Sequence, residues 1–144
     1  MRISLVLLAL ALAACGSDPD GFDDSQVPER LRSATEQAIA RVNADAGSRF
    51  RLQTGGDSSI TFRDLFPMSG YYHGDCALNL CGLNPVIEHH AVFDIDYLSA
   101  DHPPGQWPFS RIAKHEFGHA AGLGHVCDNT SYMYAADACP RPGG

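Results

Sequence analysis

Residues 115–125 read HEFGHAAGLGH, and this stretch decides how the rest of the chain is interpreted. His115 and His119 are four residues apart, so on a helix they share one face and lie about 6 Å apart along the axis. Both imidazoles can therefore reach one metal ion. Glu116 follows the first histidine directly, which places its carboxylate at the flank of that ion, where a general base would stand.

Two further positions complete the pattern. Gly122 can adopt the left-handed conformation that ends a helix and turns the chain back, so that His125 approaches the same ion. Three protein ligands leave a fourth position open, which is typical of a catalytic rather than a structural zinc site. Met133, in the run Ser131–Tyr134, follows at the distance of a Met-turn beneath the metal. The alternative is three histidines on a half-buried helix end, with the methionine as core filler.

The segment 115–134, HEFGHAAGLGHVCDNTSYMY, resembles the active-site segment of the metzincin zinc endopeptidases. It is most similar to the matrixins, whose motif also ends in Gly-His. Residues 92–96, VFDID, resemble the matrixin strand that ends in His-Phe-Asp. The resemblance implies peptide-bond hydrolysis and one catalytic Zn²⁺. It assigns three zinc ligands, one general base and one Met-turn residue: His115, His119 and His125; Glu116; Met133.

The expected fold is a small α+β domain with a short mixed sheet and two main helices, the active-site helix being followed by the Met-turn. Residues 28–46 predict the first helix, because apolar side chains recur on one stripe behind Pro28. Residues 49–54 and 60–65 alternate as strands do. Residues 66–86 are predicted to be loop-rich. Residues 86–98 carry the strand expected to run along the cleft, and no counterpart of the family's first strand is apparent before residue 28.

The N-terminus is typical of an exported protein. Met1-Arg2, an apolar run and the sequence Leu-Ala-Ala-Cys predict a lipoprotein signal peptide over residues 1–14, with Cys15 lipidated. The alternative is ordinary cleavage that leaves Cys15 as a free thiol. Residues 15–27 are then a flexible tether and residues 28–144 the catalytic domain. The protein is expected to be anchored to the cell membrane or outer membrane of a bacterium, facing the periplasm or exterior.

Five cysteines are an odd number for an exported chain, and assigning Cys15 to the lipid leaves four that can pair. Of the three pairings we favour Cys76 with Cys81 and Cys127 with Cys139. Metal ligation is the alternative for Cys76, because His73 and Asp75 adjoin it.

The sequence leaves two further metal sites open, one for calcium and one for a second zinc ion. In matrixins, carboxylates at the positions of Asp94 and Asp96 bind Ca²⁺. The glutamate that completes the calcium-binding pattern of the family is replaced here by Tyr97. His73-Gly74-Asp75 resembles part of the matrixin structural zinc site, whereas Val92 replaces a histidine of that site. The neighbouring His89 and His90 are expected to be exposed to solvent or at a sheet edge.

The sequence carries a net charge of −7 without a basic patch, which argues against nucleic-acid binding. The histidine motif and the resemblance together imply a zinc endopeptidase, expected to be monomeric, that acts on a protein or peptide. The substrate backbone is expected to align along an edge strand near residues 88–93. A non-catalytic zinc-binding surface lipoprotein that acts as an interaction module is the alternative. Hydrolysis of a non-protein amide would use the same site.

Overall fold

The computed structural model describes residues 21–76, 87–99 and 107–140. The predicted signal peptide, Cys15 and Cys81 lie outside the described residues, so the lipid anchor and the Cys76–Cys81 disulfide remain predictions.

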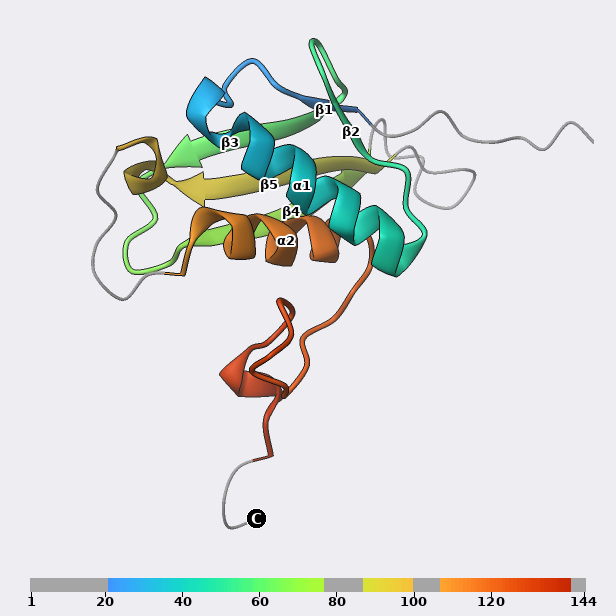
Figure 1. The fold of residues 1–144 in the computed structure, drawn as a ribbon, viewed down its shortest axis with the longest axis vertical. Coiled ribbons are helices and arrows are strands. Elements are labelled where there is room, and N and C mark those ends of the chain that lie inside the picture. The colour runs from blue at the N-terminus through green and yellow to red at the C-terminus, as the bar shows by residue number, and fades with distance from the viewer. Residues whose placement is uncertain (1–20, 77–86, 100–106, 141–144) are drawn as a thin grey trace, which may run out of the picture.

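A mixed five-stranded sheet and two helices make up the described domain, which confirms the α+β class (Figure 1). The elements are β1 (Gly21–Asp23), α1 (Glu29–Ala46), β2 (Arg51–Gln53), β3 (Ser58–Arg63), β4 (Gly70–Cys76), β5 (Ile87–Asp94), the 3₁₀ turn η2 (Ile95–Leu98), α2 (Phe109–Ala120) and the 3₁₀ turn η3 (Ala136–Ala138). The strand order is β2-β1-β3-β5-β4, and only the β4–β5 pair is antiparallel among the described strands.

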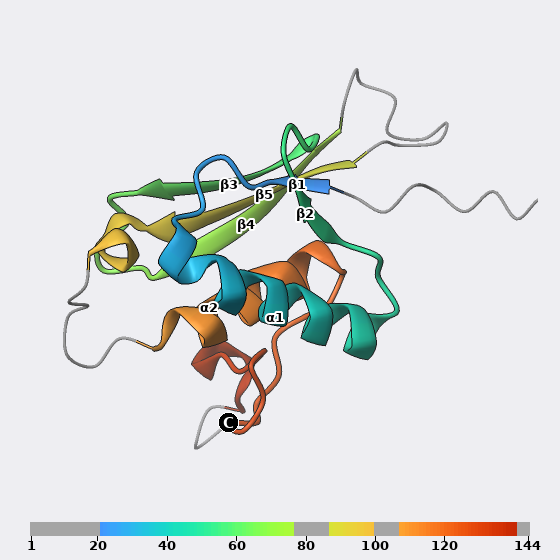
Figure 2. The ribbon, with the colours of Figure 1, turned by 45° about the horizontal axis from the view of Figure 1, so that its top comes forward.

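Both helices lie on the same side of the sheet, and the core fills the space between them (Figure 2). Ile60, Ala91 and Phe93 supply the sheet's side of this core, with Phe117 of α2 packed against Phe93. The helices are thus stabilised by burying apolar surface against the sheet, which contributes a free energy of roughly 25 cal/mol per Å².

Helix α1 forms where its apolar stripe predicted it. Pro28 precedes the first turn, where its missing N–H is not needed, and Leu31, Ile39 and Val42 are buried. Gly47 ends the helix at φ 70°, a left-handed conformation that glycine adopts without strain. No helix in the described part of the chain is long and apolar enough to cross a membrane.

The tether prediction is wrong for its second half. Residues 21–23 form β1, which lies between β2 and β3 in the sheet, and Phe22 is fully buried against Phe50 and Phe117. Val27 is also buried. One phenylalanine among polar residues gave no period to detect, yet it fills a core position. The folded domain therefore begins by residue 21 rather than 28.

The cleft strand is also corrected. β5 is flanked by β3 on one side and β4 on the other, so residues 88–93 are not an edge. The edge strand next to β5 is β4, which forms within the stretch predicted to be loop-rich. Every residue from Gly70 to Cys76 faces a partner in β5, and this pairing outweighs the unfavourable strand propensity of its two glycines.

We expect Phe22→Ala to lower the free energy of unfolding by about 3–5 kcal/mol, because it removes a fully buried ring. Phe66→Ala is the matched control, since Phe66 is 78% exposed. Urea unfolding of both variants measures the difference. Equal, small effects would show that residues 21–23 do not belong to the core.

Candidate metal centre

The two histidines of helix α2 lie on the face that is turned away from the core, because the opposite face is buried against the core. Phe109, Ala113 and Phe117 are buried, which fixes the rotation of the helix. His115 and His119 then lie one turn apart on a half-buried face.

The helix ends as the sequence predicted. Gly122 has φ 83°, its N–H bonds to His119 O, and the N–H of Leu123 bonds to Gly118 O. This paired closure is the usual way to satisfy the last carbonyls of a helix when the chain reverses direction. The reversal brings His125 back over α2.

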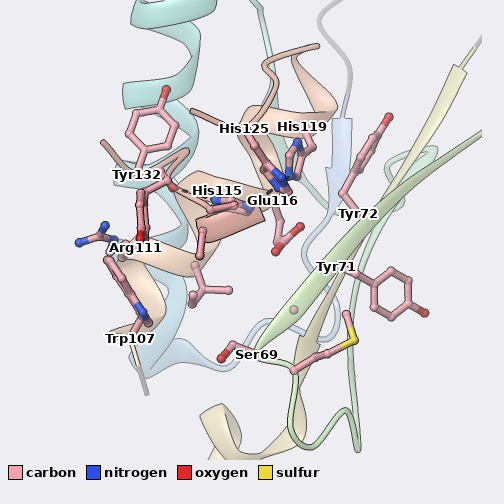
Figure 3. Close-up of a pocket in the computed structure, with 16 residues that line it drawn as sticks. Ser69, Tyr71, Tyr72, Trp107, Arg111, His115, Glu116, His119, His125 and Tyr132 are labelled. Atoms are coloured by element: carbon pink, nitrogen blue, oxygen red, sulfur yellow. Dashed lines mark hydrogen bonds between the residues drawn. The ribbon is translucent and has the colours of Figure 1, made fainter. Parts of the chain in front are cut away.

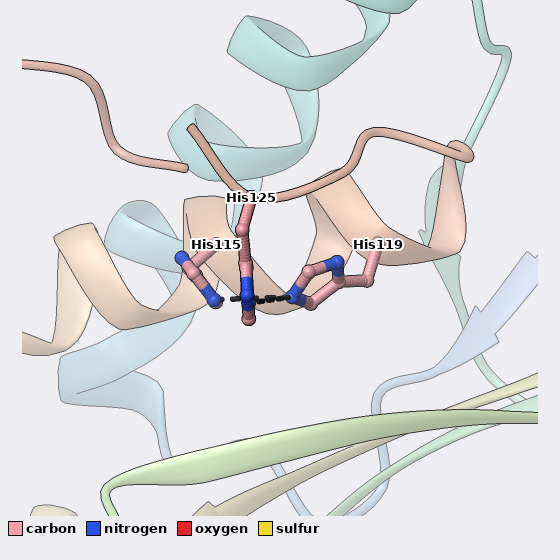
Figure 4. A group of neighbouring side chains, drawn as sticks. All are labelled: His115, His119 and His125. Atoms are coloured by element: carbon pink, nitrogen blue, oxygen red, sulfur yellow. Dashed lines mark hydrogen bonds between the residues drawn. The ribbon is translucent and has the colours of Figure 1, made fainter. Parts of the chain in front are cut away.

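The three histidines meet at their Nε2 atoms (Figure 4). Nε2 of His119 is 3.1 Å from Nε2 of His115 and 3.1 Å from Nε2 of His125. Two imidazoles on one tetrahedral zinc ion would place their nitrogens about 3.3 Å apart, given metal–nitrogen bonds of about 2.05 Å. Among the described residues these three side chains form the one group of histidines, cysteines or carboxylates able to share a metal ion.

The opposite ring nitrogens determine which tautomer is present. Nδ1 of His115 lies 2.8 Å from Tyr132 O, and Nδ1 of His119 lies 3.0 Å from Leu123 O. A carbonyl oxygen only accepts, so both Nδ1 atoms carry the proton and both Nε2 atoms present lone pairs. Converging lone pairs repel one another unless a cation lies between them. The residues present therefore fit a metal ion.

Burial supports the same conclusion. Desolvation lowers the pKa of both His115 and His119 below the ordinary histidine value, which favours the neutral imidazole that binds metals.

Glu116 lies beside the triad and is 5% exposed. Burial raises the pKa of Glu116 to about 7, because a carboxylate loses its hydration there. Figure 3 shows its carboxyl group directed towards β4. A Cβ at Gly70 would come within 3.3 Å of Cγ of Glu116, so a glycine at the start of β4 allows the close approach.

A cavity of ≈ 500 Å³ opens between α2 and β4 in front of the triad (Figure 3). Ser69, Tyr71 and Tyr72 line it from the β4 side, and Trp107 and Ile112 from the α2 side. The triad and Glu116 are therefore accessible to a ligand that lies along β4.

Met133 lies under α2, 4% exposed, as a Met-turn would place it. A Cβ at Gly118 would be 2.4 Å from its sulfur, so the helix and the turn are in direct contact at a glycine. The predicted Cys127–Cys139 disulfide is confirmed, and it closes the loop that carries this methionine.

The other metal predictions gain no support. Asp94 is 1% exposed, its Oδ1 accepts from the N–H of Asp96, and its Oδ2 has no hydrogen-bond partner among the described residues. Neither Asp94 nor Asp96 joins a group of three ligand side chains in the described residues. The rings of His73 and His90 stack with their centroids 4.7 Å apart. Among the described residues, no third histidine, cysteine or carboxylate joins them in a group that could hold a metal ion. The sequence left a calcium ion and a second zinc open, and neither gains support from the described residues.

The expectation that His89 is exposed is wrong. Its side chain is 7% exposed, packs against Phe22 and Phe50, and Nδ1 lies 2.9 Å from the hydroxyl of Tyr72. His90 is half-buried and contacts Ser59. His89 is buried because its side of β5 is the side covered by the core.

Sequence reasoning missed the groups that lie next to the Nδ1 atoms of the three histidines. They are the carbonyls of Leu123 and Tyr132, and the carboxylate of Asp137, whose Oδ1 is 3.3 Å from Nδ1 of His125. A backbone carbonyl leaves no residue-type signal, and a lone aspartate in an exposed loop is unremarkable by composition.

A scan against models of known protein families gives no match, and a search of curated proteins finds no significantly similar sequence. Functional assignment therefore depends on the residues and their geometry.

In the metal-free protein, Glu116→Gln should stabilise the fold more at high pH than at low pH. Below a pH of about 4.5 the carboxyl is protonated in both folded and unfolded chains; above about 7 the folded chain must bury its charge, a cost of at most about 3 kcal/mol. Urea unfolding of both proteins at about pH 5 and about pH 8 tests this. A difference that does not grow with pH would contradict the burial argument.

Gly118→Ala should displace Met133 and lower the free energy of unfolding by about 1–3 kcal/mol, because the added methyl meets the sulfur. Gly124→Ala is the control, since a Cβ there meets nothing within 4 Å. Thermal unfolding of the two variants should separate them. A harmless Gly118→Ala would mean that the turn is not packed against α2.

Proposed function

We propose that the chain is a zinc-dependent endopeptidase of the metzincin type, most similar to the matrixins. The observation that carries the proposal is the combination of three converging Nε2 atoms with a buried carboxyl group beside an open cavity. His115, His119 and His125 would hold the ion, and the sequence pattern from residue 115 to Met133 agrees with that family.

The chain's own groups have separate roles in peptide hydrolysis. Zinc, when bound, supplies a Lewis acid and lowers the pKa of a coordinated water to about 7. Glu116 accepts the proton of the attacking water and delivers it to the leaving amine. Its burial suits this role, because a base with a pKa near neutrality can also act as an acid.

β4 is the strand along which a substrate would lie. It ends the described sheet, and one side of its backbone is not paired with β5. An extended peptide can add to such an edge through backbone hydrogen bonds, which supply affinity, while pockets for alternate side chains set specificity. Residues 70–72 line the cavity, so the added backbone would pass in front of Glu116.

Export and lipid anchoring belong to the same proposal. The disulfide Cys127–Cys139 is typical of proteins in an oxidising compartment. It supports export, which the predicted signal peptide also implies. Together with the predicted anchor at Cys15, export would place the active site at a bacterial cell surface or in the periplasm.

The zinc-loaded full chain, in mild detergent, should cleave an unfolded protein, and Glu116→Ala should slow cleavage by about 10²–10⁴-fold at equal zinc content. Glu36→Ala, on the exposed surface of α1, is the matched control and should cleave at the wild-type rate. Fragment release followed by mass spectrometry measures the rates. Equal zinc in all three proteins with no cleavage by any would instead favour the zinc-binding interaction module.

A further inference from the structure

The third histidine differs from the other two in what its Nδ1 contacts. His115 and His119 face backbone carbonyls, whereas Nδ1 of His125 lies 3.3 Å from the carboxylate of Asp137. A carboxylate carries a full negative charge, so it polarises the imidazole more than a carbonyl does. In the described part of the chain, no other basic side chain lies within ion-pair distance of Asp137.

His125 also has the least support from the protein core. It follows the helix end, in a segment where residues 124–130 are all exposed, and its side chain is 35% exposed. Its ring is not fixed by helix geometry, as those of the first two ligands are. A separate contact is therefore needed to keep its Nε2 directed at the shared point.

The fold supplies that contact through three links across one loop. The N–H of Val126 bonds to Met133 O, and the N–H of Ala135 bonds to Val126 O. The disulfide ties Cys139, the residue directly after η3, to Cys127. Asp137 is the middle residue of η3, so these links hold its carboxylate next to His125.

We propose that Asp137 is a positioning residue, which fixes the tautomer and direction of His125 and thereby strengthens zinc binding. This inference rests on the zinc site of the proposed function, but not on proteolysis. A carboxylate that accepts from Nδ1 leaves the Nε2 lone pair free and makes it a stronger donor to the metal. It also places a compensating negative charge near the cation.

Zinc affinity tests the role directly, by competition with a chromophoric chelator. Asp137→Ala should weaken zinc binding by about 10- to 100-fold. Asp137→Glu, which restores a carboxylate, should recover most of the loss. Asp57→Ala removes an exposed carboxylate that lines no part of the cavity, and it should bind zinc within about twofold of wild type.

Two readouts separate positioning from a general loss of structure. The thermal midpoint of metal-free Asp137→Ala should match that of the wild type, because an exposed contact between a carboxylate and an imidazole contributes little to stability. The visible spectrum of the cobalt-substituted variant should change in band position and intensity, since it reports the ligand arrangement around the ion.

The disulfide provides a coupled test. A Cys127→Ser, Cys139→Ser background removes one of the three links, so η3 and the carboxylate of Asp137 are held less firmly beside His125. The effect of Asp137→Ala on zinc affinity should then shrink to about threefold or less, a non-additivity that identifies a shared function.

Zinc affinity of Asp137→Ala within about twofold of wild type would overturn the inference. So would a full effect of that substitution in the disulfide-free background. A tenfold loss of affinity without proteolysis by the wild type would leave Asp137 as a positioning residue and remove the endopeptidase proposal instead.

Discussion

The site depends on one constraint: two backbone carbonyls accept from Nδ1 of His115 and His119 and so force their Nε2 lone pairs towards a common point. Such an arrangement is unfavourable without a cation, because the two Nε2 atoms are 3.1 Å apart and their lone pairs repel each other. The carbonyls come from Leu123 and Tyr132, which both follow α2. The ligand geometry of the helix is therefore determined by the segment beyond it, and that segment must fold for the helix histidines to bind metal well.

A second cost lies beside the first. Glu116 is buried without an ion-pair partner among the described residues, and its raised pKa records the unfavourable desolvation. A core position would be more stable with an apolar side chain. The packing of α2 against β5 and of Met133 against Gly118 offsets this cost, since both contacts fix the helix that carries the site. Stability and chemistry are thus divided between two faces of one helix.

Local patterns were enough to predict α1, the helical histidine pair, the turn at Gly122 and the Cys127–Cys139 disulfide. Each of these features can be recognised from residues close in sequence, or from a residue type that strongly prefers one conformation or one partner. β1 and β4 could not be predicted in this way. A three-residue strand with a single phenylalanine and a strand with two glycines exist because distant partners pair with them. Asp137 gave no signal for the same reason: its role depends on a fold-level contact.

The correction of the edge strand changes how the site would work. With β5 in the interior, its backbone groups are already bonded to β3 and β4 and cannot receive a substrate. With β4 at the edge, the first residue of that strand is Gly70, which also borders Glu116. A peptide paired with β4 would then bring its backbone, rather than a side chain, closest to Glu116. The same glycine that obscured the strand in the sequence lets β4 pack closely against Glu116 and Ile112 of α2.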